Sequence, residues 1–114
     1  MADCLFCDFA SGAKKPAVVY EDADYLAFRD INPQAPVHIL LIPKRHIAKL
    51  TDLSEADAAL AGGMLLAANN VAKQEGFFER GYRSVFNCER ESGQSVWHIH
   101  MHILAGRKMT WPPG

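Results

Sequence analysis

"SVWHIHMHIL", residues 95–104, alternates histidine with apolar residues, and this stretch decides the fold. Successive side chains of a β-strand point to opposite faces, so His98, His100 and His102 would share one face, each about 7 Å from the next. In an α-helix the same three imidazoles would spread around the axis. The spacing therefore predicts a strand over 97–104, with one face of histidines and one apolar face packed on the core.

The remaining sequence supplies partners for this strand. Runs of β-branched, aromatic and other apolar residues predict four more strands, at 18–20, 25–28, 37–42 and 82–87. Ser54 begins a long helix with Asp57 in the capping-box position, and Gly76 ends it. Inside the helix lie a Gly62–Gly63 pair, which permits close packing, and an apolar stripe at Leu60, Met64, Ala67 and Val71. Because most connections are short, we expect one α+β domain with an antiparallel sheet.

The composition excludes several classes of protein. The chain has 114 residues and a net charge of −1, so no strong field attracts nucleic acid or an anionic membrane. No apolar run approaches the roughly 18 residues of a membrane span, and residues 1–4 lack the pattern of a signal peptide. Three cysteines are too few for a disulfide framework. We therefore expect a cytoplasmic protein that binds neither nucleic acid nor membranes.

The histidine row has three chemical interpretations. The imidazoles form a polar strand face held by hydrogen bonds alone, or their three nitrogens bind one catalytic zinc ion. In the third interpretation, one imidazole attacks phosphorus while its neighbours orient it and handle protons, since an imidazole with a pKa of about 6.5 is available as a neutral nucleophile at pH 7. The adjacent Gly93-Gln94-Ser95 supplies donors for phosphate oxygens without fixed charge, which favours the third interpretation.

The stretch from His98 to Leu104 resembles the signature of the histidine triad (HIT) family. The segments RDINPQAPVHILLIPKRH (29–46) and GQSVWHIHMHILAGRKM (93–109), together with Asn87 and the terminal WPPG, resemble the HINT branch of that family, the nucleoside phosphoramidases. The similarity covers nearly the whole chain. It implies a single HIT domain over 1–114, with a five-stranded antiparallel sheet, one long helix and one short helix.

The resemblance implies hydrolysis of the P–N bond in phosphoramidates of adenosine or another purine nucleoside. His100 would be the nucleophile and form a covalent nucleotidyl-imidazole, and His102 would hold the phosphate and help to protonate the leaving amine. Ser95 would donate a hydrogen bond near the leaving group, and His38 would join the proton relay and orient His100. Water would then release the mononucleotide. The alternative functions are a non-catalytic nucleotide-binding regulatory module and a dinucleoside polyphosphate hydrolase.

The resemblance also implies where an AMP-like nucleotide binds. Asp30 would accept hydrogen bonds from the ribose hydroxyls, and Ile31 and Phe28 would supply apolar walls for the base. The phosphate end would be lined by Asn87, Gly93, Gln94, Ser95, His100 and His102. From the residues alone, the turn after Asp30 is equally typical of a plain strand end, and His38 of a buried core histidine.

Cys4 and Cys7 form a CxxC pair, and some members of the HIT family hold a structural zinc ion. Two thiolates with His46 and His98 would complete a tetrahedral Cys2His2 site, which would leave His98 outside the chemistry. A thioredoxin-like redox pair is the competing interpretation, but no βαβ pattern follows the motif, and simple burial is a further alternative. We expect a structural zinc ion and no organic cofactor.

The resemblance implies a homodimer as well. The two subunits would join through the long helix and the strand at 82–87, so that the two sheets merge into a larger one. The tail at about 107–114 would reach towards the partner's site. Its composition alone predicts a frayed end instead.

Overall fold

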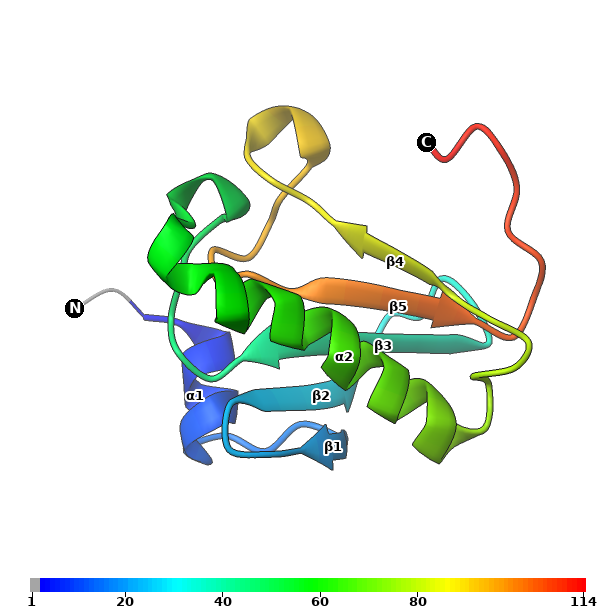
Figure 1. Ribbon diagram of the computed structural model, residues 1–114, viewed down its shortest axis with the longest axis horizontal. Coiled ribbons are helices and arrows are strands. Elements are labelled where there is room, and N and C mark those ends of the chain that lie inside the picture. Colours follow the sequence, from blue (N-terminus) through cyan, green and yellow to red (C-terminus); the bar gives the residue numbers. More distant parts are fainter. Residues whose placement is uncertain (1–2) are drawn as a thin grey trace.

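The strand at the centre of the sheet is β3 (Val37–Pro43), whose apolar run is buried along almost its whole length. This computed structural model describes residues 3–114. The neighbours of β3 are β2 (Tyr25–Arg29) and β5 (Met101–Ala105), and the edge strands are β1 (Val18–Glu21) and β4 (Arg83–Phe86). All pairs are antiparallel, in the order β1-β2-β3-β5-β4 (Figure 1). The predicted five-stranded antiparallel sheet is therefore confirmed.

Strand β5 begins at Met101 rather than at the predicted residue 97. The antiparallel register between β3 and β5 places Pro43 opposite Ile99. A proline has no N–H to donate to the ladder, so pairing stops there. The Ile99 N–H instead donates to the Ile47 carbonyl at 2.7 Å. The first two histidines of the row therefore precede the regular strand.

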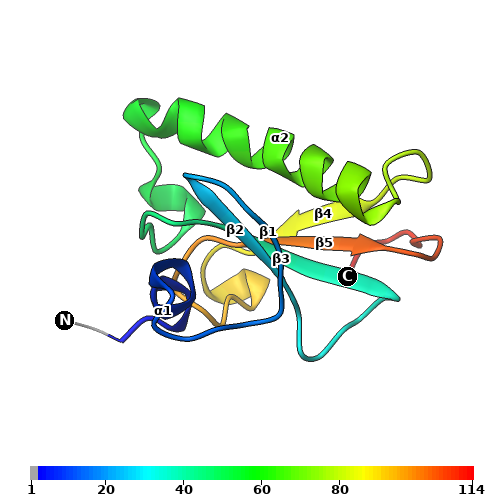
Figure 2. The same ribbon diagram turned by 90° about the horizontal axis from the view of Figure 1, so that it is seen from below.

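Helix α2 (Ala58–Glu75) covers one face of the sheet (Figure 2). It follows the 3-10 helix η2 (Glu55–Asp57), where Ser54 forms the predicted capping box, and it ends at Gly76 in the left-handed conformation. Its buried side chains are Met64, Ala67, Ala68, Val71 and Ala72. They share one core with the apolar members of the alternating stretch, which are Ile99, Met101 and Ile103. The predicted apolar face of that stretch is therefore confirmed.

The short helix α1 (Leu5–Ser11) lies on the opposite face of the sheet (Figure 2). The sulfur of Cys4 caps the helix by accepting a hydrogen bond from the Cys7 N–H at 3.2 Å. Phe6 is its buried residue, and it packs in a second apolar cluster with Leu26, Phe28, Leu40 and Ile42. Helix α1 and this apolar cluster therefore form a partly apolar wall beside the histidine face.

Two further 3-10 helices lie in connections. The first, η1 (Leu50–Asp52), precedes α2, and the second, η3 (Arg90–Ser92), lies between β4 and β5. Across residues 3–114, the helices fall short of the length and hydropathy that crossing a bilayer requires.

Gly63 lets α2 approach the sheet at Tyr25. A Cβ atom at residue 63 would overlap the Tyr25 hydroxyl, which donates to the Leu60 carbonyl at 2.6 Å. We expect Gly63→Ala to lower the free energy of unfolding by about 2 kcal/mol, because overpacking outweighs the gain in helix propensity. In a Tyr25→Phe background, which removes the overlapping oxygen, the same change is expected to destabilise by at least about 1 kcal/mol less. Urea unfolding of the wild type, the two single variants and the double variant measures this coupling. An equal loss of unfolding free energy in both backgrounds would contradict it.

Candidate active site and metal cluster

A cavity of about 590 Å³ opens on the α1 side of the sheet, beside the histidine face. Eight of the residues predicted to bind nucleotide line it, namely Phe28, Asp30, Ile31, Asn87, Gly93, Ser95, His100 and His102. They come from β2 and the turn after it, from the loop that follows β4, and from β5 with the segment before it. Of the predicted catalytic and nucleotide-binding residues, His38 and Gln94 lie outside the lining.

His100 is held in a defined tautomer. Its Nδ1 lies 2.9 Å from the His98 carbonyl, which only accepts, so Nδ1 carries the proton and Nε2 keeps a lone pair. The edge of its ring packs against Phe6, with the ring centroids 5.3 Å apart. Among residues 3–114 no group hydrogen-bonds to the His100 Nε2. This buried side chain therefore combines a fixed orientation with a free ring nitrogen at the cavity.

His102 is oriented by His38. The Gln34 N–H donates to the His38 Nδ1 at 3.0 Å, so a neutral His38 carries its proton on Nε2. That nitrogen lies 2.9 Å from the His102 Nδ1 and 3.4 Å from a carboxylate oxygen of Asp30. The His102 Nδ1 is thus an acceptor, and its Nε2 carries the proton. The prediction that His38 orients His100 is wrong, since the described contacts of His38 join it to His102.

Asp30, His38 and His102 are also close enough together to suggest a metal site. A metal at the His38 Nε2 would need a lone pair there. The hydrogen bond from the Gln34 N–H already occupies the lone pair of the other nitrogen, so a neutral His38 has none to spare. His38 and His102 are therefore joined by a hydrogen bond, with the Asp30 carboxylate near the same nitrogen of His38.

The pKa of His102 is lowered to about 4, because burial disfavours the charged ring and the imidazoles of His100 and His38 add to this, against a smaller opposing effect of Asp30. Burial also lowers the pKa of His38, although the Asp30 carboxylate opposes the effect. Both rings are therefore neutral at pH 7. A neutral His102 presents an N–H donor to an anion in the cavity.

This shift predicts a loss of stability in acid. The ordinary pKa of histidine is 6.5, so below that value the unfolded chain binds a proton at His102 that the folded protein binds only near pH 4. The contribution of His102 to the free energy of unfolding is fully present above pH 6.5. It falls by about 2 kcal/mol between pH 7 and pH 5. We expect His102→Asn, whose side-chain oxygen can still accept from His38, to lose less over this range. Unfolding curves at both pH values measure the difference, and parallel losses would disprove the assignment.

The loop over residues 87–96 borders the end of the cavity where the phosphate was predicted to bind. Asn87, Gly93 and Ser95 line the cavity, and among residues 3–114 the Ser95 hydroxyl has no hydrogen-bond partner. Gln94 lies between two lining residues but turns inward, where its amide bonds to backbone groups. Its predicted side-chain contact with phosphate is therefore not supported by its placement.

Helix α1 supplies a wall of the cavity that was not predicted from the sequence. Leu5, Phe6 and Phe9 line the cavity, and Phe9 packs edge-on against the predicted base wall Phe28, with the centroids 5.0 Å apart. Lys15 and the two residues after it also reach the lining. Apolar residues at positions 5, 6 and 9 follow helical spacing, which was the available signal.

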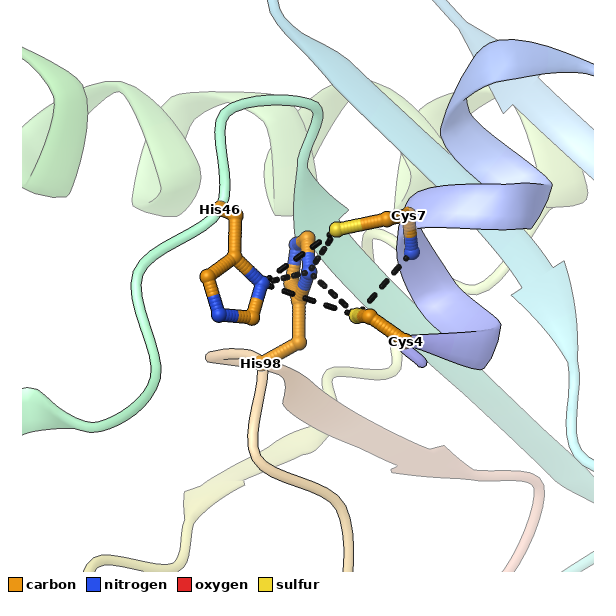
Figure 3. Close-up of side chains that lie close together, drawn as sticks. All are labelled: Cys4, Cys7, His46 and His98. Atoms are coloured by element: carbon orange, nitrogen blue, oxygen red, sulfur yellow. Dashed lines mark hydrogen bonds between the residues drawn. The ribbon is translucent and has the colours of Figure 1, made fainter. Parts of the chain in front are cut away.

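The four predicted metal ligands converge at one point (Figure 3). Cys4 and Cys7 come from the start of α1, His46 from the connection after β3, and His98 from the segment before β5. Each Nδ1 lies 3.2–3.5 Å from both sulfur atoms, and the two Nδ1 atoms are 3.2 Å apart. A tetrahedral zinc ion places nitrogen and sulfur ligands about 3.3–3.6 Å apart, so the cluster has the size of such a site.

The hydrogen-bond chemistry of the cluster also fits a metal. The His98 Nε2 donates to the Pro43 carbonyl at 2.7 Å, so the Nδ1 of this fully buried ring offers a lone pair to the cluster. A carbonyl behind a ligating histidine is the usual support of such ligands. Burial, and secondarily the Cys4 side chain, raise the pKa of Cys7 to about 11. A cation is what would stabilise two thiolates held this close.

Comparison with known proteins identifies relatives over almost the whole chain. A family model described as HIT domain matches residues 11–109. An uncharacterized HIT-like protein of Synechococcus elongatus is 53% identical over 97 residues, which cover 85% of this chain and 84% of that protein. A 14 kDa zinc-binding protein of Zea mays is 54% identical over 99 residues, covering 85% of this chain and 77% of that one.

Solved structures agree with this result. A HIT family hydrolase from Legionella pneumophila superposes with a TM-score of 0.95 at 53% identity, covering 98% of this chain and all of that one. A histidine triad nucleotide-binding protein from Candida albicans superposes with a TM-score of 0.80 at 30% identity, covering 96% of this chain and 83% of the other. With three alternating histidines beside a cavity and this extent of similarity, the chain belongs to the histidine triad (HIT) family.

Proposed function

We propose that the protein is a hydrolase that cleaves the P–N bond of adenosine or other purine nucleoside phosphoramidates through a covalent nucleotidyl-His100 intermediate. The observation that carries the proposal is the tautomer of His100. Its Nδ1 proton is committed to the His98 carbonyl, and the ring lines the cavity with a free nitrogen. The solved relative from Legionella pneumophila, described as a hydrolase, and the one from Candida albicans, described as nucleotide-binding, support the same reaction class.

In the first step, the His100 Nε2 attacks phosphorus as the bond from phosphorus to the amine breaks. The amine leaves with the electron pair and takes a proton, because an amide anion is a very poor leaving group. His102 helps to deliver that proton and donates to a phosphate oxygen, and the negative charge of a bound phosphate raises its pKa towards the useful range. Ser95, exposed at the cavity, donates a hydrogen bond at the leaving nitrogen.

In the second step, water attacks the phosphorus and gives one proton to His102, which replaces the proton delivered to the amine, as the bond to His100 breaks. The His100 nitrogen recovers its lone pair, and the mononucleotide leaves with the water oxygen. The His98 carbonyl remains bonded to the Nδ1 proton and stabilises the positive charge that the ring carries in the intermediate.

The chemistry of the lining supports the choice of a nucleotide as the ligand. One oxygen of Asp30 accepts the Asn32 N–H at 2.8 Å, and the carboxylate keeps lone pairs for the ribose hydroxyls. Phe28 and Ile31 contact the base together with the residues of α1. Ile31 is completely exposed in the free protein, so a bound base would cover it.

We further propose that Cys4, Cys7, His46 and His98 hold a structural zinc ion. None of the four lines the cavity, which separates the metal from the reacting atoms. The Zea mays relative is described as zinc-binding, which supports the choice of metal. The ion supplies cohesion between α1 and the sheet and no chemistry. Our proposal needs no organic cofactor.

The homodimer and the cytoplasmic location also remain proposals. Leu65 and Leu66 on α2 are 55% and 67% exposed, and the edge of β4 faces away from β5, so a second copy has an apolar helix face and a strand edge to join. Trp111 in the tail at about 107–114 is 80% exposed and available to a partner. The three cysteines form no disulfide, as is usual in a reducing compartment.

A substrate survey tests the activity. Adenosine phosphoramidates with alkyl amines and dinucleoside polyphosphates are compared under single-turnover conditions. Quenching in cold denaturant at alkaline pH, where a nucleotidyl-histidine is stable, and mass spectrometry trap the adduct on His100. We expect AMP and free amine from the first class, at least about tenfold faster than cleavage of the second. Faster cleavage of dinucleoside polyphosphates would favour that hydrolase class. AMP binding without any turnover would leave a nucleotide-binding regulatory module.

A further inference from the structure

The buried Gln94 makes three hydrogen bonds that join two segments of the chain beside the cavity. Its side-chain oxygen accepts the Glu89 N–H at 2.9 Å, and its amide nitrogen donates to the carbonyls of Ala48 and Val96 at 2.9 and 3.0 Å. One bond reaches the connection after β3, and two lie within the 87–96 loop. This one side chain therefore fixes the loop internally and attaches it to the body of the domain.

The turn that Gln94 supports has an unusual backbone. Glu89 has a φ of 67°, in the left-handed region that residues other than glycine rarely adopt. A strained residue persists where its surroundings hold it, and the partly buried bond from its N–H to Gln94 is a constraint of that kind. Release of this bond frees the turn to relax, and with it the residues on either side.

The 87–96 loop has a second attachment to the body of the domain, an ion pair at the surface. Lys49 pairs with the Glu89 carboxylate at 2.7 Å, with side chains that are 30% and 48% exposed. Exposed ion pairs contribute little, because solvent screens them and both side chains lose freedom. Gln94 is 9% exposed, so each of its lost bonds would leave a backbone group without a partner.

We propose that Gln94 is a positioning residue, which holds the 87–96 loop and acts on the reaction through the Ser95 hydroxyl. Its inward turn sends its neighbours Gly93 and Ser95 to the cavity. Among residues 3–114 the Ser95 hydroxyl makes no hydrogen bond that would hold it there, so the loop backbone sets where this hydroxyl lies relative to His100. This inference rests on the proposed function, in which Ser95 donates to the leaving nitrogen. A displacement of about 1 Å in such a group lowers rates by about 100-fold.

The test compares Gln94→Met with Lys49→Met. Methionine matches the length of glutamine and removes all three bonds, and the lysine variant removes the surface attachment of the same loop. We expect Gln94→Met to lower kcat for an alkylamine phosphoramidate by about 10- to 100-fold, with faster amide exchange confined to residues 87–96. Lys49→Met is expected to stay within about twofold of the wild type. Gln94→Asn keeps a shorter amide and is expected to recover part of the rate.

A double-mutant cycle separates positioning from a general loss of structure. In a Ser95→Ala background, Gln94→Met is expected to lower kcat by less than about threefold, because its effect passes through the missing hydroxyl. An equal loss in both backgrounds overturns the proposal, as does an unchanged exchange rate in the loop. If the wild type cleaves no phosphoramidate, the proposed function fails. Loop exchange and AMP affinity of Gln94→Met then still decide whether Gln94 holds the loop, and wild-type values for both would overturn that role.

Discussion

Replacement of His100 by asparagine is expected to lower kcat for an adenosine phosphoramidate by at least about 1,000-fold while AMP binds within a few-fold of the wild-type affinity. Asparagine is close in shape and its amide can still donate to the His98 carbonyl, which holds the wild-type ring in place. It offers no lone pair of comparable nucleophilicity. The route through a covalent intermediate is therefore closed, and the walls of the cavity are kept.

The measurement is a pair of experiments on the same protein. Single-turnover rates give the chemical step, and calorimetric titration with AMP gives the affinity. His102→Asn is the matched control, because the same substitution two residues away removes a donor but leaves the nucleophile. We expect that variant to lose about 10- to 100-fold and still to form the trapped adduct. A His100→Asn protein that keeps more than about a tenth of the wild-type rate would exclude His100 as the nucleophile.

The histidine row shows which parts of the site a sequence can predict. The alternation of three histidines with Ile99, Met101 and Ile103 fixes two faces through a local rule, and the structure follows it. The start of the strand depends on Pro43, whose missing N–H acts on a residue more than 50 positions later. That effect requires the register between two strands, which no local pattern contains.

The partners of the side chains were harder to predict for the same reason. His38 and His102 are 64 positions apart in the chain, and the direction of each ring follows from the β3–β5 register and the Gln34 N–H. Gln94 was expected at the phosphate because of its place in the sequence beside Ser95. Its inward direction follows from the carbonyl of Ala48, 46 positions away. The metal ligands were easier, since CxxC and histidine chemistry restrict the choice.

Loss of the metal is the other large expected effect. A site that binds zinc with a Kd one thousandth of the free zinc concentration stabilises the folded protein by about 4 kcal/mol. We therefore expect the Cys4→Ser, Cys7→Ser protein to lose bound zinc and a comparable free energy of unfolding. Serine is a good helix N-cap, so the double variant still caps α1 and isolates the metal from the capping bond of Cys4. Cys88→Ser, at the third free cysteine outside the cluster, is the matched control and should keep its zinc.

The effect of the metal is expected to extend to the cavity, because two groups next to the proposed ligands, Phe6 and the His98 carbonyl, contact His100. Phe6 lies between the two cysteine ligands and packs against His100, and the carbonyl of the ligand His98 holds the His100 Nδ1 proton. Without the ion, α1 is attached through Phe6 and its apolar neighbours alone, so AMP affinity should fall by about tenfold or more as one wall loosens. Metal analysis, urea unfolding and AMP titration of the wild type, the Cys4→Ser, Cys7→Ser protein and Cys88→Ser measure the bound zinc, the free energy of unfolding and the AMP affinity. Stoichiometric zinc in the Cys4→Ser, Cys7→Ser protein would refute the ligand set, and zinc-free protein with wild-type stability and AMP affinity would show that the cluster supports neither α1 nor the cavity.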